Sequence, residues 1–239
     1  MDENKYSRFG LALRVVLGLA VVVAVGAGLM NQVASQEKGA GPAKAEPPAA
    51  SQPSDEEEAQ AMEIMKMSQE LATPGENHKV LDSLVGNWNL SIRSWMGGPD
   101  APATESKGTS EAHWVLGGRY IVENLKCEYM MPDPETGKER PASFEGIGTI
   151  GYDNYKNLYV YTWIDNMGTA ILVSKGGCDP LGKVLSLYGE MDEPEFGVQG
   201  RMVKYVTRIV NQDKRVFEMY DLLAGDDHKM MEITYTRRK

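Results

Sequence analysis

From Gly86 to the C-terminus, apolar and polar residues alternate in short stretches that are separated by turn-forming residues. In the first stretch Trp88, Leu90 and Ile92 alternate with polar residues, which places the three on one face of a β-strand. Nine breaks rich in Gly, Pro, Asn and Asp follow, at 97–100, 117–118, 132–141, 153–154, 165–168, 176–180, 192–200, 211–214 and 225–227. Because these residues favour tight turns, the pattern predicts about ten antiparallel strands in a closed barrel or sandwich.

The two ends of this strand series predict how the sheet closes. Alternation in the last stretch places Ile233, Tyr235 and Arg237 on one face, so the Arg237 guanidinium should arrive beside Trp88 at the start of the first strand. A Gly-x-Trp at the first strand and an Arg at the end of the last resembles the calycin superfamily, which includes lipocalins and fatty-acid-binding proteins. The resemblance implies that Trp88 and Arg237 pack together and close the barrel.

Several separated motifs give a closer resemblance over residues 78–237. They are 78–81 (HKVL), 84–88 (LVGNW), 114–120 (WVLGGRY), 144–146 (FEG) with 151–153 (GYD), 163–169 (WIDNMGT) and 231–235 (MEITY). Together they look like the bacterial family known as domain of unknown function 1579, which is predicted to be lipocalin-like. The resemblance implies an all-β, closed antiparallel barrel of about ten strands with a short N-terminal helix. It brings no activity and no catalytic residues.

The N-terminal third of the chain divides by composition into three segments before the barrel domain at 78–239. Residues 1–35 combine basic residues with an uncharged apolar run at 15–30, which indicates a signal peptide or an N-terminal membrane anchor. Residues 36–54 form an Ala/Pro-rich linker predicted to be disordered. We therefore expect export: the protein is periplasmic or secreted if the signal is cleaved, and otherwise is anchored with the barrel outside the cytoplasm.

Residues 55–77 are predicted to form a short helix and a connector. Ser54 and Glu57 fit a capping box, and Thr73-Pro74-Gly75 ends the helix. Two interpretations stay open, a helix packed on the barrel and a mobile lid over a cavity mouth.

Charge and motif content exclude several functions for this chain of 239 residues. The formal net charge of -9 argues against a nucleic-acid partner. We expect the protein to contact a membrane only through its N-terminal segment. His78, His113 and His228 lack the spacing of a local metal-ligand pair and are expected to be solvated or to cap helices. No nucleophile with a neighbouring base and no phosphate-binding loop is present in the sequence. We expect no cofactor, no metal and no catalytic residue.

Two cysteines raise the question of a disulfide. Export would place Cys127 and Cys178 in an oxidising compartment. However, Cys127 falls inside a predicted strand and Cys178 in a later turn, so a bridge and two separate buried thiols both remain open.

Seven residues are candidates to bind a ligand inside the barrel. They combine aromatic rings with polar tips or carboxylates: Trp114, Glu123, Tyr159, Tyr161, Trp163, Asp165 and Tyr205. Tyr159, Tyr161, Trp163 and Asp165 occupy every second position, which places them on one face of their strand. The pattern leaves open whether this face points inward. Asp165 could instead be a turn residue whose carboxylate accepts a hydrogen bond from the backbone of the same turn.

Glu123 is the strongest acid/base candidate, because its strand face is otherwise predominantly apolar. A carboxylate there should have a raised pKa or meet a cation such as Arg119 or Arg237. A slipped register would instead turn Glu123 to solvent.

Three functional hypotheses follow from these features. The first is an exported barrel that binds a small apolar or amphipathic ligand in its interior without catalysis. The alternative is a structural or protein-interaction module of the cell envelope with a solid-packed barrel. The second alternative is a hydrolase or isomerase that uses Glu123 as a buried carboxylate.

Overall fold

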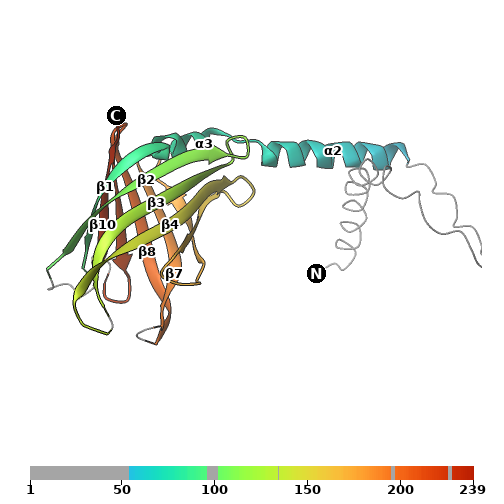
Figure 1. Ribbon diagram of the computed structural model, residues 1–239. Coiled ribbons are helices and arrows are strands. Elements are labelled where there is room, and N and C mark those ends of the chain that lie inside the picture. Colours follow the sequence, from blue (N-terminus) through green and yellow to red (C-terminus); the bar gives the residue numbers. More distant parts are fainter. Residues whose placement is uncertain (1–53, 96–101, 134, 195–196, 226–227) are drawn as a thin grey trace, which may run out of the picture. The chain divides into compact units, whose positions relative to one another are not determined.

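The computed structural model describes residues 54–95, 102–133, 135–194, 197–225 and 228–239 (Figure 1). The described residues fall into two units, one up to Glu70 and one from Leu71 onward. The predicted signal or anchor at 1–35 and the linker up to residue 53 lie outside the described residues.

Within the part of the chain that the structure describes, three helical segments precede the strands. They are α2 (Asp55–Ala72), α3 (Glu76–Lys79) and the 3₁₀ helix η1 (Val80–Leu84). The strands are β1 (Gly86–Ser94), β2 (Thr104–Val115), β3 (Tyr120–Pro132), β4 (Glu139–Asp153), β5 (Leu158–Asp165), β6 (Leu172–Cys178), β7 (Val184–Glu193), β8 (Val198–Asn211), β9 (Lys214–Asp221) and β10 (Lys229–Arg237).

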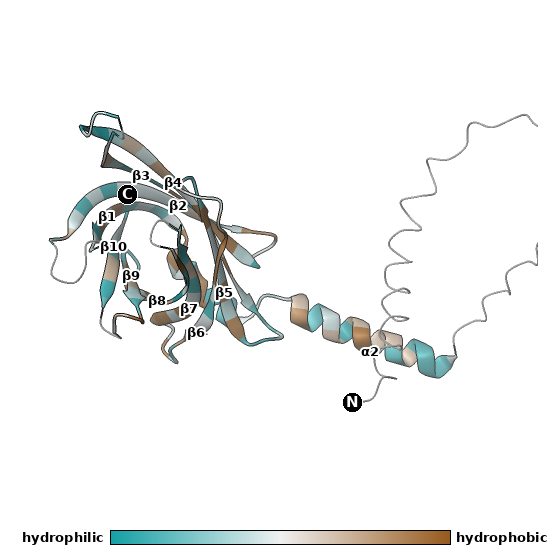
Figure 2. Cartoon of the chain, turned by 90° about the horizontal axis from the view of Figure 1, so that it is seen from below, coloured by the Kyte–Doolittle hydropathy of each residue, from teal (hydrophilic) through white to brown (hydrophobic). Residues whose placement is uncertain are grey.

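The ten strands form one closed antiparallel barrel in which each strand pairs with its neighbours in sequence. Closure comes from β1 and β10, which pair from Trp88 opposite Arg237 to Ser94 opposite Met231. Figure 2 views the strands from below and shows them arranged around a ring. The prediction of a closed, ten-stranded, lipocalin-like barrel with a short N-terminal helix is therefore confirmed.

Alternating burial along the strands explains why this sequence folds as a barrel. In β1, Trp88, Leu90 and Ile92 are buried while the residues between them are exposed. Apolar side chains of all strands thus converge inside the ring, where burial removes their surface from water.

The segment α3–η1 fills one end of the barrel. Leu81 and Leu84 of η1 are buried and belong to a core cluster with Ile121, Ile150 and Leu185. His78 of α3 is buried as well, and its Nδ1 accepts a hydrogen bond from the Gly75 backbone N–H at 3.1 Å. The expectation that a histidine caps a helix thus fits His78, whereas His113 is exposed on β2. We call this end of the barrel the plugged end.

At the plugged end Trp88 and Arg237 form the contact that the sequence predicted. Trp88 is 0% exposed, and the Arg237 guanidinium carbon lies 4.2 Å from the centre of its ring. Arg237 also donates to the backbone oxygens of Val85 and Gln212, each at 2.9 Å. The Trp88 indole N–H donates to the Leu84 oxygen at 3.0 Å, which ties η1 to the barrel. A cation over an indole and donors on open carbonyls together secure the closing strands.

Helix α2 begins with the predicted capping box. The Ser54 N–H donates to the Glu57 carboxylate at 2.8 Å, and the Glu57 N–H donates to the Ser54 hydroxyl at 3.4 Å. Four acidic residues in its first turn suit the positive end of the helix dipole. Of the helices that the structure describes, none combines the length and apolar character that a membrane span requires.

Both cysteines are free thiols. Cys127 lies in β3 and Cys178 ends β6, and burial raises the pKa of each thiol. The structure therefore supports two separate, partly buried thiols over a disulfide bridge.

Candidate functional site

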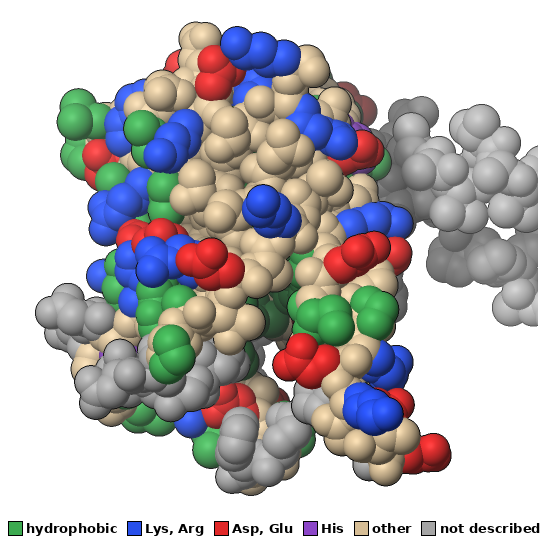
Figure 3. Space-filling view, turned by 60° about the vertical axis from the view of Figure 1, so that its left-hand side comes forward, with side chains coloured by type: hydrophobic (Ala, Val, Ile, Leu, Met, Phe, Trp, Pro, Cys, Tyr) green, Lys and Arg blue, Asp and Glu red, His purple; other side chains and the backbone are tan. Residues whose placement is uncertain are grey.

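A cavity of about 1290 Å³ occupies the interior of the barrel beyond η1. Its lining is predominantly apolar and comes from all ten strands. The lining reaches from Leu84 at the plugged end to Met130 near the far end of β3 and to Met167 and Ile171 in the loop after β5, so the mouth lies at that opposite end. Figure 3 shows the surface hollowed at the lower end of the molecule, with hydrophobic side chains along the edges of the hollow.

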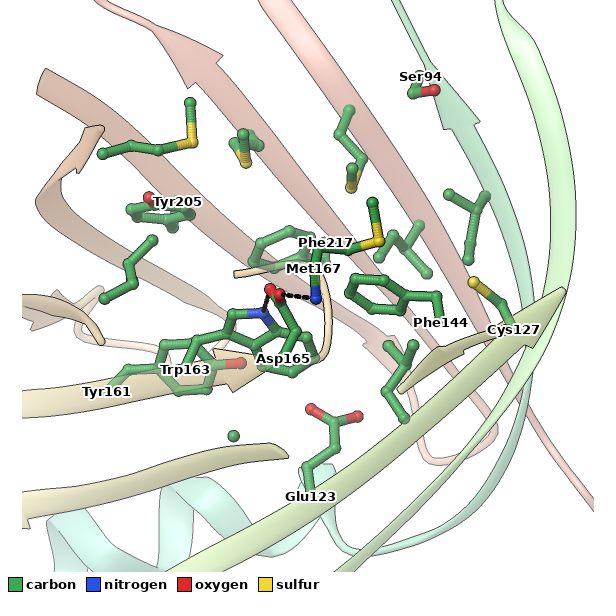
Figure 4. A pocket seen from close by; sticks show the side chains of 18 of the residues that line it. Ser94, Glu123, Cys127, Phe144, Tyr161, Trp163, Asp165, Met167, Tyr205 and Phe217 are labelled. Atoms are coloured by element: carbon green, nitrogen blue, oxygen red, sulfur yellow. Dashed lines mark hydrogen bonds between the residues drawn. The ribbon is translucent and has the colours of Figure 1, made fainter. Parts of the chain in front are cut away.

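Aromatic rings stacked side by side cover one wall of the cavity (Figure 4). The Trp163 ring stacks with Phe144 at 6.2 Å between centres and 17° between planes, and with Tyr161 at 6.4 Å and 22°. We call Phe144, Trp163 and Tyr161 the aromatic wall.

Glycines of β4 make room for this wall. A Cβ at Gly146 would lie 2.1 Å from Trp163, and one at Gly148 would lie 2.6 Å from the Tyr161 hydroxyl. The two rings therefore lie directly on the β4 backbone. This arrangement also decides which face of β5 points inward, namely the face that carries Tyr161, Trp163 and Asp165.

Asp165 lies at the end of β5, beside the aromatic wall. Its carboxylate accepts a hydrogen bond from the Trp163 indole N–H at 2.8 Å and one from the Met167 backbone N–H at 2.9 Å, as Figure 4 shows. The second bond is the turn contact that the sequence predicted. The first fixes the plane of the Trp163 ring, so Asp165 both shapes the loop after β5 and lines the cavity.

Glu123 points into the cavity from β3 and pairs with Arg215 of β9, at 2.8 Å between Oε1 and the guanidinium. The Ser110 hydroxyl donates to the same oxygen. Neither Arg119 nor Arg237, the cations suggested as partners of Glu123, pairs with it. Arg119 instead donates to the Leu116 backbone oxygen, and Arg237 is held over Trp88.

Arg215 is held by aromatic rings as well as by Glu123. Its guanidinium carbon lies 3.8 Å from the centre of the Tyr235 ring and 5.1 Å from that of Trp88. The side chain is 6% exposed, against 13% for Glu123. A buried guanidinium needs such compensation, and here a carboxylate and two rings supply it.

Tyrosine hydroxyls complete the polar part of the cavity. Burial, with the negative charge of Glu123 nearby, raises the pKa of Tyr161 and Tyr235, and burial alone raises that of Tyr205. All three phenols therefore stay neutral at physiological pH. The Tyr205 hydroxyl and the Arg215 Nε are buried without a hydrogen-bond partner.

Five of the seven candidate ligand residues line the cavity, namely Glu123, Tyr161, Trp163, Asp165 and Tyr205. The other two, Trp114 and Tyr159, contact the segment α3–η1, which we call the plug. The Trp114 indole N–H donates to Asp82 of η1 at 2.9 Å, and the Tyr159 hydroxyl donates to the Asn77 backbone oxygen of α3 at 2.9 Å. Burial raises the pKa of Tyr159 to about 12. Trp114 and Tyr159 therefore position the segment that fills the plugged end.

Arg215, Phe144 and Phe217 also line the cavity, although they were not among the predicted ligand-binding residues. The sequence does contain a signal for Arg215. It lies two and four residues before Phe217 and Met219 in β9, so it shares their strand face, and both of these residues line the cavity. Met167 and Ile171 carried no such signal, since both lie in the loop between β5 and β6, where strand alternation does not apply.

Among the described residues, no group of three or more His, Cys, Asp or Glu side chains could hold a metal ion. Among the described residues, the charged side chains at inward strand positions of the cavity are Glu123, Asp165 and Arg215, and two of these form an ion pair. The described geometry thus offers packing surface and a few polar contacts.

Closed topology, a plugged end and an apolar interior define a small antiparallel barrel of the lipocalin-like type with an internal cavity. Residues 73–237 match the model of a family described as "Protein of unknown function (DUF1579)". The chain therefore belongs to the DUF1579 family. No curated protein matches the chain.

One solved structure with a similar outline is a redesigned β-barrel. It is 11% identical to this chain, with a TM-score of 0.30, and the match covers 70% of this chain and 100% of that one. A likeness at this level carries no argument about function.

Proposed function

We propose that the barrel binds a small apolar or amphipathic molecule in its cavity and does not catalyse a reaction on it. This proposal rests on the cavity of about 1290 Å³ and its predominantly apolar lining. Ligand pockets in proteins typically occupy about 300–1,000 Å³ and combine apolar walls with a few polar groups. The cavity is thus large enough for a molecule with a long alkyl chain or several rings.

The arrangement of the polar groups supports binding over catalysis. Glu123 is paired with Arg215 and Ser110, and Asp165 receives two hydrogen bonds that shape its loop. Both carboxylates therefore have contacts that hold the barrel and its loops in place. The cavity also favours ligand binding over the alternative of a solid-packed interaction module.

We further propose that the chain is exported. The support is the apolar run at 15–30 with basic residues before it. N-terminal sequencing of the protein purified from its native envelope fraction tests this: a new N-terminus near Gln36 indicates a cleaved signal, and an intact N-terminus in the membrane fraction indicates an anchor. Recovery of the intact chain from the cytoplasm would contradict export.

Native mass spectrometry tests ligand binding. The purified protein is incubated with a total lipid extract, separated from free lipid and weighed intact; we expect one added mass of small-molecule size. The variant Gly146→Ala should lose this mass, because the new Cβ displaces the Trp163 ring, whose free side is the cavity. Gly177→Ala is the matched control, since a Cβ there meets nothing within 4 Å. Retention of the full apo mass by the wild-type protein would contradict the proposal.

A further inference from the structure

The charges inside the cavity are not balanced. Arg215 is the one basic residue among those that line the described cavity, whereas the lining includes the carboxylates of Glu123 and Asp165 at inward strand positions. Five further acidic residues, Glu105, Glu128, Glu139, Glu190 and Asp192, border the cavity near its mouth.

The single cation is already neutralised. Arg215 and Glu123 lie 2.8 Å apart, and both side chains are largely buried. The aromatic rings of Tyr235 and Trp88 also hold the Arg215 guanidinium. An anionic ligand that took Arg215 would leave Glu123 as an uncompensated buried charge, which is strongly unfavourable.

Asp165, in contrast, has hydrogen bonds but no counter-ion. Its two contacts, with the Trp163 indole N–H and the Met167 N–H, both come from neutral donors. A carboxylate offers about four lone-pair positions, so acceptor capacity remains on both oxygens. Within the described part of the chain Asp165 forms no ion pair, so the inward-facing side chains of the cavity carry one unbalanced negative charge.

The aromatic wall lies directly beside this carboxylate. Trp163 stacks with Phe144 and with Tyr161, and Figure 4 shows the Asp165 side chain against the Trp163 ring. Aromatic faces attract cations, and the attraction increases when the cation is removed from water. An aromatic surface next to an unpaired carboxylate is therefore suited to an ammonium group.

We propose that the cavity selects a hydrophobic ammonium compound, an amine or quaternary ammonium with an apolar tail, with Asp165 as its counter-ion. This inference rests on the proposed function and names its ligand class. The ammonium group lies over the aromatic wall beside Asp165, and the apolar tail extends along the remaining apolar lining. Anionic amphiphiles of the same length bind more weakly, because they add a second unbalanced negative charge.

Three chain-matched competitors test the inference on the full-length protein. The neutral fluorophore N-phenyl-1-naphthylamine fills the cavity, and decyltrimethylammonium, decanol and decanoate, each below its micellar concentration, displace it. At about pH 8, where decanoate is ionised, we expect decyltrimethylammonium to bind about tenfold more tightly than decanol. Decanoate should be the weakest of the three.

The variant Asp165→Asn separates the site from the general negative charge of the protein. It keeps an oxygen for the Met167 N–H, gives up the hydrogen bond from the Trp163 indole N–H and removes the counter-ion, so it should bind decyltrimethylammonium and decanol with similar affinity. Glu111→Gln is the matched control: it removes the same charge from an exposed residue that is paired with Arg238 near the plugged end, and it should keep the tenfold preference. Most of the preference should persist at about 0.5 M salt, since a partly buried charge pair such as Asp165 with an ammonium group is screened less than an exposed one.

Two outcomes overturn the inference in distinguishable ways. Binding of decanoate as tight as that of decyltrimethylammonium, or an unchanged preference in Asp165→Asn, would refute the ammonium site while ligand binding stands. Failure of the fluorophore and of all three competitors to bind would refute the proposed function together with this inference.

Discussion

The two ends of the barrel use the same kind of residue for different purposes. At the plugged end Trp88 is fully buried, and its indole N–H binds a backbone oxygen of η1. Toward the mouth Trp163 has one face on the β4 backbone and lines the cavity, and its indole N–H binds the Asp165 carboxylate. The difference arises because η1 fills one end of the ring and nothing among the described residues fills the other.

We therefore expect the stability of the barrel and its ligand binding to depend on residues at different positions along its axis. Substitutions at the plugged end should lower the free energy of unfolding, whereas substitutions at the cavity wall should mainly alter ligand binding.

The largest effect on stability is expected for Trp88→Ala. Truncation removes a fully buried ring together with its contacts to Arg237 and Leu84, and should lower the free energy of unfolding by about 3–5 kcal/mol. Urea denaturation followed by circular dichroism measures it. Trp163→Ala, which enlarges an existing cavity, should cost less than half as much, and equal losses for the two variants would contradict the distinction between the ends.

The next largest effect is expected where the two regions meet, at the Glu123–Arg215 pair. Glu123→Gln leaves the Arg215 guanidinium buried without its counter-charge and should destabilise the protein by about 3 kcal/mol. Adding Arg215→Met removes the stranded charge, so the double variant should regain most of this loss in the same denaturation assay. A single variant as stable as the wild type would show that the pair is not a buried ion pair in solution.

A smaller effect on stability is expected at two neighbouring glycines of β6, Gly176 and Gly177, which can be compared directly. A Cβ at Gly176 would lie 2.0 Å from the Ser186 backbone oxygen, so Gly176→Ala should force the strands apart and cost about 1–3 kcal/mol. Gly177→Ala, where a Cβ meets nothing within 4 Å, should be close to neutral. Thermal unfolding of the two variants in parallel checks this, and similar melting temperatures would contradict the close packing of β6 on β7.

The smallest effect is a pH dependence that originates in the plug. Burial, with the positive charge of Arg119 nearby, lowers the pKa of His78 below its ordinary 6.5. The folded state therefore favours the neutral ring, and this contribution to stability is present above pH 6.5 and is lost as the pH falls through the lower folded pKa. Titration of the His78 imidazole signals by NMR, in the folded protein and in denaturant, measures the shift; an unshifted folded value would contradict the burial of His78.

The sequence was sufficient to predict the barrel, because strand alternation and turn residues are local signals. Trp88 and Arg237 could be paired from strand parity alone, and the structure confirms their contact. The same reasoning could have found Arg215, which has the parity of Phe217.

The division of the interior into plug and cavity could not be predicted from alternation. Tyr159 and Tyr161 have the same parity and the same chemistry, yet the Tyr159 hydroxyl bonds to α3 while Tyr161 lines the cavity. The difference depends on how far η1 penetrates the ring, which is a property of tertiary packing. The predicted partner of Glu123 was wrong for a related reason. Glu123 of β3 pairs with Arg215 of β9, and these two strands are not neighbours in the sheet.

The indole N–H signals of Trp88 and Trp163 in a nitrogen-15 NMR spectrum provide the most direct test of the comparison. Adding N-phenyl-1-naphthylamine should shift the Trp163 signal in a saturable manner and leave the Trp88 signal unchanged, because of these two indoles Trp163 lines the cavity and Trp88 does not. An unchanged Trp163 signal at saturating fluorophore, or equal shifts of both indoles, would contradict a barrel with one plugged end and one ligand-binding cavity.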